Sequence, residues 1–148
     1  MSSNAAYQPD NYQSVIPYIH ASNATKLMEF IKVVFGAKEI AVYPRPDGKI
    51  AHAAFRIGDS VVELADGGPE WPAMPCAMQV YVPDTDAAYQ RALKAGATSL
   101  SEPTDQFYGD RCANVRDVCG NNWYIATQKE ALSKEEIDKR IAAMSQSG

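Results

Sequence analysis

The stretch HAAFRIGDSVVELAD, residues 52–66, decides how this chain folds. It is typical of two short strands joined at Gly58 and Asp59, a residue pair that favours a tight hairpin turn. Side chains alternate along each strand, so the hairpin has two unlike faces. One face is continuous and apolar, and we expect it to pack on helices. The other face suits the wall of a cavity and carries His52, Ala54, Arg56, Val61, Glu63 and Ala65.

The pattern around this hairpin occurs twice in the chain. Each half predicts a strand, an amphipathic helix that ends at glycine, and three further strands. The helix ends FGA and AGA lie sixty positions apart, and the order of elements repeats. We therefore predict an α+β fold in which two βαβββ modules form one cupped, mixed β-sheet cavity, followed by a C-terminal helix.

The repeat also sets the expected boundaries. A loop rich in glycine and proline, residues 67–75, separates module 14–66 from module 76–130, and neither module offers enough core to fold comfortably alone. Together they form a single domain, 14–130. We expect residues 1–13 to be a flexible tail. Residues 131–148 hold the final helix and tail, with a capping box from Ser133 to Glu136.

Composition narrows the classes of partner. The chain has 148 residues and a net charge of −4, with no dense basic block, so nucleic acid is not an expected partner. No run reaches the length of a membrane span, and the N-terminus lacks the features of a secretory signal. The three cysteines, Cys76, Cys112 and Cys119, indicate reduced thiols in a cytoplasmic protein.

His52 and Glu63 are the first candidates for chemistry because they lie diagonally on the polar face of the hairpin, within reach of one ligand. They could act together as an acid–base pair at a carbon next to a carbonyl. The structural alternative is that Arg56 forms an ion pair with Glu63. Both interpretations remain open on the sequence alone.

Other strands add polar residues to the same kind of surface. Tyr18 and His20 share one face of the first strand, Gln79 and Tyr81 one face of the fifth, and Tyr124 lies on the last. Each face is more polar than its opposite, as expected for the wall of a partly aqueous cavity. Half-buried tyrosines in a sheet would give the same pattern.

Three segments resemble the vicinal oxygen chelate superfamily, and its PhnB-like branch in particular. They are IPYIHASNATKLMEFIKVVFGAKE (16–39), PDGKIAHAAFRIGDSVVEL (46–64) and DQFYGDRCANVRDVCGNNWYIAT (105–127). In the last, QFYGDR followed by a D-x-x-G-x-x-W turn is the most specific feature. The superfamily includes glyoxalase I, extradiol dioxygenases and bleomycin-resistance-type binding proteins. The resemblance implies paired βαβββ modules around a cupped site, and usually a homodimer.

The enzymes of that superfamily hold a divalent metal with four inward residues, typically His and Glu. The resemblance places these positions on or near Ile16, on Glu63, on or near Ala77, and on Tyr124. Only Glu63 is a good metal ligand, so we expect no metal and no other cofactor. The alternative is a divalent metal held by His20, His52 and Glu63.

The sequence therefore predicts a metal-free protein that binds a small organic molecule in the cup. The alternative is a lyase, isomerase or dioxygenase-like enzyme in which His52 and Glu63 are metal ligands or an acid–base pair. We expect Tyr108 near the mouth of the pocket, and Trp71 over the cavity or at a subunit contact. Arg111 is a candidate for holding an anionic or carbonyl group, unless it forms a structural salt bridge with Asp110 or Asp117.

Overall fold

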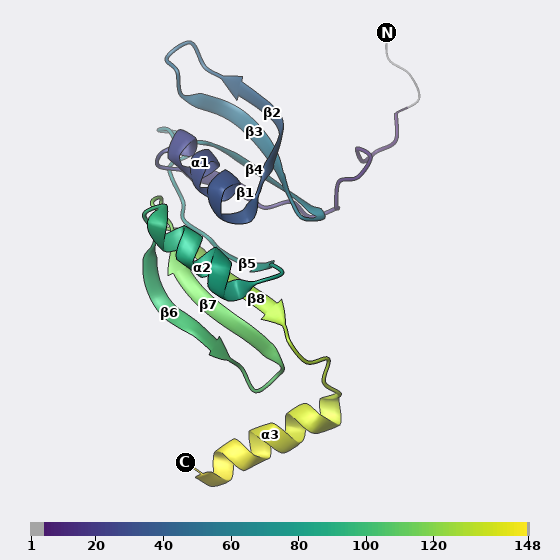
Figure 1. Ribbon diagram of the computed structural model, residues 1–148. Coiled ribbons are helices and arrows are strands. Elements are labelled where there is room, and N and C mark those ends of the chain that lie inside the picture. Colours follow the sequence, from purple (N-terminus) through teal and green to yellow (C-terminus); the bar gives the residue numbers. More distant parts are fainter. Residues whose placement is uncertain (1–4, 148) are drawn as a thin grey trace.

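The computed structural model describes residues 5–147 and contains two four-stranded mixed sheets (Figure 1). The first sheet has the order β1-β4-β3-β2, with β1 parallel to β4 and the other neighbours antiparallel. Helix α1 follows β1 in the chain. The bounds are β1 Tyr18–Ala21, α1 Ala24–Phe35, β2 Lys38–Pro44, β3 Ile50–Ile57 and β4 Ser60–Asp66.

The second sheet repeats this topology with the order β5-β8-β7-β6. Helix α2 again follows the first strand of its module. The bounds are β5 Ala77–Tyr81, α2 Thr85–Lys94, β6 Thr98–Asp105, β7 Asp110–Arg116 and β8 Asn122–Gln128. The predicted α+β class and the two βαβββ modules are thus confirmed.

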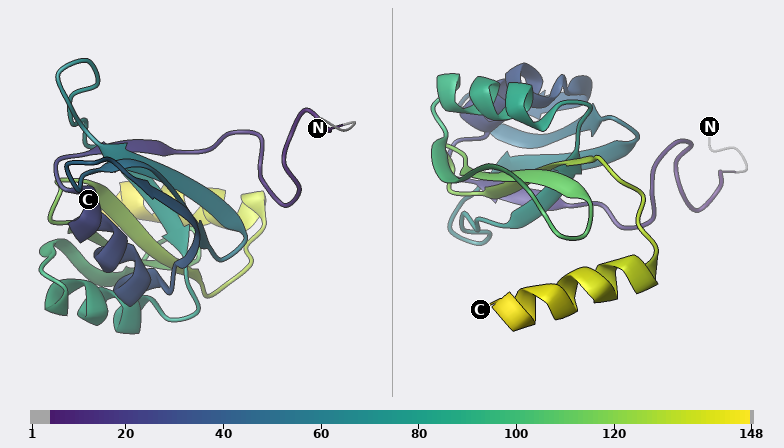
Figure 2. Two further views of the ribbon diagram at one scale, coloured as in Figure 1. Left: turned by 90° about the horizontal axis from the view of Figure 1, so that it is seen from above. Right: turned by 60° about the horizontal axis from the view of Figure 1, so that its bottom comes forward.

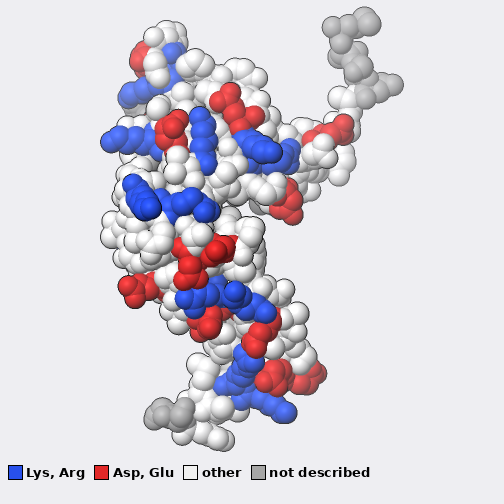
Figure 3. Space-filling view, in the orientation of Figure 1, with Lys and Arg blue, Asp and Glu red and all other residues white. Residues whose placement is uncertain are grey.

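Helices α1 and α2 pack on each other and lie on the same side of the two sheets (Figure 2). The core fills the space between these helices and the apolar sheet faces, and Leu27, Phe55 and Trp123 are almost wholly buried there. The opposite, polar faces of the sheets are left for other contacts. Lys, Arg, Asp and Glu are intermixed over the helix-covered face, so that face has no block of one sign (Figure 3).

Side-chain caps and a glycine define most of the ends of α1 and α2. Asn23 caps α1 by accepting from the Lys26 N–H, and Asp84 caps α2 by accepting from the Ala87 N–H. Gly36 ends α1 in the left-handed conformation that glycine tolerates, with φ of 65°. At α2 the cap is Ala95, one residue before the predicted stop.

The N-terminal segment is tied to the first sheet before β1 begins. Gln13 donates to the Val61 carbonyl and accepts from the Val61 N–H. The Pro17 carbonyl accepts from the Glu63 N–H, and the proline itself has no N–H to donate, so β1 begins at Tyr18.

Helix α3, Lys134–Ser147, is the predicted C-terminal helix and begins with the expected cap, in which Ser133 Oγ accepts from the Glu136 N–H. It lies apart from the two sheets in Figure 1 and in the right view of Figure 2. Arg140 joins it to the body by donating to the Phe107 carbonyl and pairing with Glu130. None of the helices in the described part of the chain could cross a membrane.

Candidate functional site

The polar face of the first sheet has the register that the hairpin predicted. Ile57 pairs with Ser60 and Ala54 with Glu63, so Gly58 and Asp59 form the turn. Strand β1 then adds Tyr18 beside Glu63. The candidate residues Tyr18, His20, His52 and Glu63 therefore lie on one face, brought together by the three strands β1, β3 and β4.

Five side chains form an aromatic row across this face, in the order Trp71, His20, Tyr18, His52 and Tyr43. Successive ring centroids are 6.0, 5.4, 5.7 and 6.2 Å apart. The two outer pairs are stacked, with interplanar angles of 23° and 22°. Small Ala65 lies beside His20 in the sheet, which leaves space for the rings to approach one another above β4.

The rings in the row are accessible from outside. Trp71 is 68% exposed, Tyr43 60% and Tyr18 41%, although large apolar side chains are usually covered in a folded protein. A hollow of about 520 Å³ adjoins the row, lined by Tyr18, His20, Arg45, Ala51, Ala65, Asp66 and Trp71. The row thus forms an open aromatic platform beside a hollow of small-molecule size.

His52 lies between a phenol and a carboxylate. Its Nδ1 is 3.0 Å from the Tyr18 hydroxyl, and its Nε2 is 3.8 Å from Glu63 Oε2. Burial and the nearby charge of Glu63 raise the pKa of Tyr18, which keeps the phenol protonated as a donor. The alternative ion pair between Arg56 and Glu63 does not form among the described residues, and Arg56 donates to the Asn11 carbonyl instead.

The second sheet presents a different surface. Gln79 pairs with Tyr124, and both are on the polar face, with Tyr81 one step further along β5. The Tyr81 hydroxyl donates to the buried carboxylate of Asp110 at 2.7 Å, and this hydrogen bond is the main cause that raises the pKa of Tyr81. This face is hydroxyl- and amide-rich and lies on the other module, away from His52 and Glu63.

The two surfaces meet at the junction between the modules. A cavity of about 460 Å³ lies there, and it includes Pro17 and Val61 on one side and Gln79 and Tyr81 on the other. Tyr108 stands beyond this cavity in the β6–β7 turn, with its ring perpendicular to that of Phe107. The seven predicted ligand-binding positions are therefore spread over two sheets and a turn, not gathered in one pocket.

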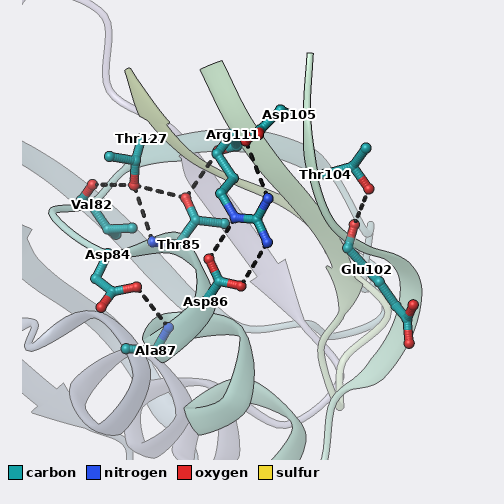
Figure 4. Close-up of polar contacts among 10 residues, drawn as sticks. All are labelled: Val82, Asp84, Thr85, Asp86, Ala87, Glu102, Thr104, Asp105, Arg111 and Thr127. Carbon is teal, nitrogen blue, oxygen red and sulfur yellow. Dashed lines mark hydrogen bonds and ion pairs between the residues drawn. The ribbon is translucent and has the colours of Figure 1, made fainter. Parts of the chain in front are cut away.

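Arg111 lies on the helix side of the second sheet, where its guanidinium is engaged by two carboxylates (Figure 4). Two of its nitrogens donate to Asp86 in α2, at 2.7 and 3.0 Å, and a third donates to Asp105 at 3.2 Å. This arrangement supports the salt-bridge interpretation, although the partners are not the expected Asp110 or Asp117. Arg111 joins α2 to β6 and β7 and faces away from Tyr81 and Tyr124.

The D-x-x-G-x-x-W turn, residues 117–123, is a structural device. The buried carboxylate of Asp117 accepts from the backbone N–H groups of Cys119 and Asn121 and from the Trp123 indole. The Asn121 side chain in turn accepts from the Cys76 N–H at the start of the second module. The most specific motif of the sequence thus holds the second sheet together and is not a ligand site.

The residues present do not fit a divalent metal. Of the superfamily's four ligand positions, Glu63 alone offers a good donor, and the Glu63 carboxylate is nearest to His52. His20 contacts Tyr18 and Trp71 through its ring, on the far side of Tyr18 from His52. Within residues 5–147, His, Cys, Asp and Glu side chains form no group of three or more placed to hold an ion.

Sequence reasoning missed Tyr43, and it expected Trp71 over the cavity or at a subunit contact. Tyr43 pairs with His52 across β2 and β3, at a register shift that the sequence does not show. Trp71 belongs to the loop between the modules, which the Met74 N–H to His20 carbonyl hydrogen bond holds against β1. The accumulation of exposed aromatic residues was the available signal, but only the tertiary structure aligns them.

Comparison with known proteins agrees with this architecture. Residues 18–125 match the Glyoxalase/Bleomycin resistance protein/Dioxygenase superfamily, and the chain belongs to that family. An uncharacterized protein of Mycobacterium bovis, Mb0911c, is 34% identical over 143 residues, covering 89% of this chain and 92% of that protein.

Solved structures show the same fold. TioX from Micromonospora sp. ML1 has a TM-score of 0.67 at 22% identity, covering 78% of this chain and 98% of its own. A PhnB protein from Bacillus cereus has a TM-score of 0.61 at 13% identity, covering 78% of this chain and 99% of its own. At these identities the likeness concerns the fold alone.

Proposed function

We propose that this protein binds a small organic molecule on the polar face of the first sheet without a metal. The aromatic row is the observation that carries the proposal. Five adjoining rings offer a broad apolar contact surface, and rings that are already stacked lose little conformational freedom when a ligand covers them. His52 and Glu63 add polar atoms that could orient the ligand.

The protein's two tryptophans allow a direct test. Trp71 is in the row and exposed, whereas Trp123 is 2% exposed in the core. Compounds that raise the melting temperature in a screen of planar heteroaromatic molecules should quench the Trp71 emission. In Trp71→Phe the quenching should disappear, while calorimetry still detects binding because the ring remains. Stabilising compounds that leave the wild-type emission unchanged would contradict a site on the row.

Metal-free binding has its own test. The protein is incubated with zinc, manganese, nickel and ferrous iron, freed of excess ion, and measured by elemental mass spectrometry. We expect far less than one ion per chain, because one carboxylate among the four family positions is a poor site. Near-stoichiometric metal that is lost in Glu63→Ala would overturn this part of the proposal.

A second candidate function is metal-free acid–base catalysis, and the contacts of His52 favour it. If the Tyr18 hydroxyl donates to Nδ1 of His52, the neutral imidazole carries its proton on Nε2. That nitrogen is the one nearest to Glu63. Such an imidazole could move a proton at a carbon next to a carbonyl. A His52→Ala variant that still binds a ligand but no longer turns it over would support this role.

We also propose that the protein is a cytoplasmic homodimer. The exposed polar faces of both sheets and the exposed helix α3 support association with a second copy. Ile141 of α3 is 44% exposed although it lies one turn beyond Ile137 on the same side of the helix. The three free cysteines are consistent with a reducing compartment.

A further inference from the structure

We propose that the ligand of the aromatic row is a planar cation, with its flat ring system stacked on the row and its positive charge held near Glu63. The proposal rests on the function proposed above and specifies the chemical class of the ligand. It is derived from the arrangement of the rings and from the balance of charges around them.

The spacing of the rings favours a flat ligand. Trp71 and His20 are stacked at one end of the row, and Tyr43 and His52 at the other, with Tyr18 tilted between them. A planar molecule can stack on the exposed rings at the ends of the row, Trp71 and Tyr43, without displacing their neighbours, whereas a bulky aliphatic molecule makes less contact with a flat ring. The faces of Tyr and Trp rings carry negative electrostatic potential, so they also attract a cation.

Charge on the same face favours a positive ligand. The side chain of Glu63 is 21% exposed, and its nearest basic partner is His52, whose Nε2 lies 3.8 Å away. That distance exceeds a direct hydrogen bond, so the carboxylate can still accept one from a ligand. A cationic ligand that binds beside the partly buried Glu63 carboxylate would stabilise the charged form of that carboxylate.

Two arginines lie near this face, and each has another partner. Arg45, at the rim of the adjoining hollow, forms an ion pair with Asp47 at 3.4 Å. Arg56 donates to the Asn11 carbonyl and lies opposite Lys38 and Val61 near the β3–β4 turn, four residues along β3 from His52. The carboxylate of Glu63 lies 3.8 Å from the His52 ring in the row, so we expect it to repel an anionic ligand.

Four probes of known charge test the proposal: N-methylquinolinium, quinoline, naphthoate and tetramethylammonium. Affinities are measured by calorimetry under mildly alkaline conditions, with Trp71 emission to locate the site. We expect N-methylquinolinium to bind about tenfold more tightly than neutral quinoline, a typical size for a cation–ring interaction reinforced by a carboxylate. Naphthoate should bind more weakly than quinoline, and tetramethylammonium, which lacks a ring, should also bind weakly.

The variant Glu63→Gln separates charge from shape. In it the preference for N-methylquinolinium over quinoline should fall to about twofold or less, while the affinity for quinoline is retained. Glu39→Gln is the matched control, since Glu39 pairs with Phe55 in β3 and lies on the other face of the sheet. This control removes the same charge and should keep the full preference.

The outcomes distinguish this proposal from the function on which it rests. If the planar probes bind and quench Trp71 but show no preference for the cation, the ligand class is wrong and the binding site stands. If the preference persists unchanged in Glu63→Gln, the proposed role of Glu63 is wrong. If none of the four probes binds, both the ligand class and the aromatic platform are contradicted.

Discussion

At the scale of single residues, two carboxylates, buried Asp117 and half-buried Asp66, organise this protein by accepting from N–H groups. Asp117 accepts from Cys119, Asn121 and Trp123 within one turn. Asp66 does the same in the first module, where its two oxygens accept from the Ala24 N–H and the Ile50 N–H. Each carboxylate thus satisfies donors that burial would otherwise leave unpaired.

Replacing Asp117 with alanine should therefore be strongly destabilising. The change leaves several buried donors without acceptors, which we expect to lower the free energy of unfolding by about 3 kcal/mol or more. Urea denaturation monitored by circular dichroism measures this. Asp138→Ala, which removes an exposed ion pair with Lys134 in α3, is the control and should change stability by no more than about 0.5 kcal/mol. Equal effects of the two substitutions would contradict the assigned role of Asp117.

The hydrogen bond from Tyr81 to Asp110 should be visible in alkaline solution. The pKa of Tyr81 is raised in the folded protein, so the unfolded chain loses this proton first as the pH rises. The bond contributes stability below about pH 10, and that contribution is lost above it. We expect Tyr81→Phe to have a melting temperature that falls less steeply with pH in this range. An unchanged slope would show that the bond does not form in solution.

At the scale of elements, ion pairs attach helix α2 to its sheet. Arg111 reaches from β7 to Asp86 in the first turn of α2 and to Asp105 at the end of β6. These two ion pairs connect α2 to β6 and β7. An arginine that sequence reasoning proposed for ligand binding therefore has a positioning role in the fold.

Helix α2 should loosen in acid through this link. The Arg111 guanidinium lowers the pKa of Asp86 in the folded state, so its contribution to stability is present above about pH 4 and is lost as the pH falls further. Asp86→Asn should lower the melting temperature at neutral pH and reduce its decline in acid. Melting curves between neutral and acidic pH test this, with Asp10→Asn in the N-terminal segment as the control. If Asp86→Asn declines as steeply as the wild type, Asp86 is not the responsible group.

At the scale of the whole molecule, the exposed helix α3 and the open polar faces support the proposed homodimer. An isolated helix of this length is marginally stable in water, so α3 needs a surface to pack on. Arg140 links α3 to its own chain through the Phe107 carbonyl and Glu130. A homodimer in which α3 contacts the partner would cover its apolar side.

Light scattering after size exclusion should show a dimer for the full chain. Ile141→Asp should shift the protein toward monomer, because a charge at an apolar contact between subunits carries a desolvation cost. Ala142→Asp adds the same charge on a neighbouring side of α3 and should leave the dimer intact. A monomeric wild type would contradict the proposed homodimer, and an unaffected dimer in Ile141→Asp would exclude α3 from the interface.

The sequence by itself determined the two modules and the hairpin register, because these depend on contacts between near neighbours in the chain. The alternation of side chains around Gly58 and Asp59 suffices to place His52 and Glu63 on one face. Asn23 and Asp84 cap their helices through bonds to residues three positions away. Side-chain periodicity and local hydrogen bonds can be read from the order of residues alone.

The tertiary structure alone decided which polar residues meet. Parallel pairing of β1 with β4 sets Tyr18 beside Glu63, and the loop between the modules carries Trp71 to His20. Arg111 was predicted to hold a ligand group. It instead pairs with Asp86 of α2, on the face of the second sheet opposite to Tyr81 and Tyr124. Such contacts join residues that are separated by tens of positions in the chain. The packing of helices on sheets selects these contacts, and the local pattern of residues does not encode that packing.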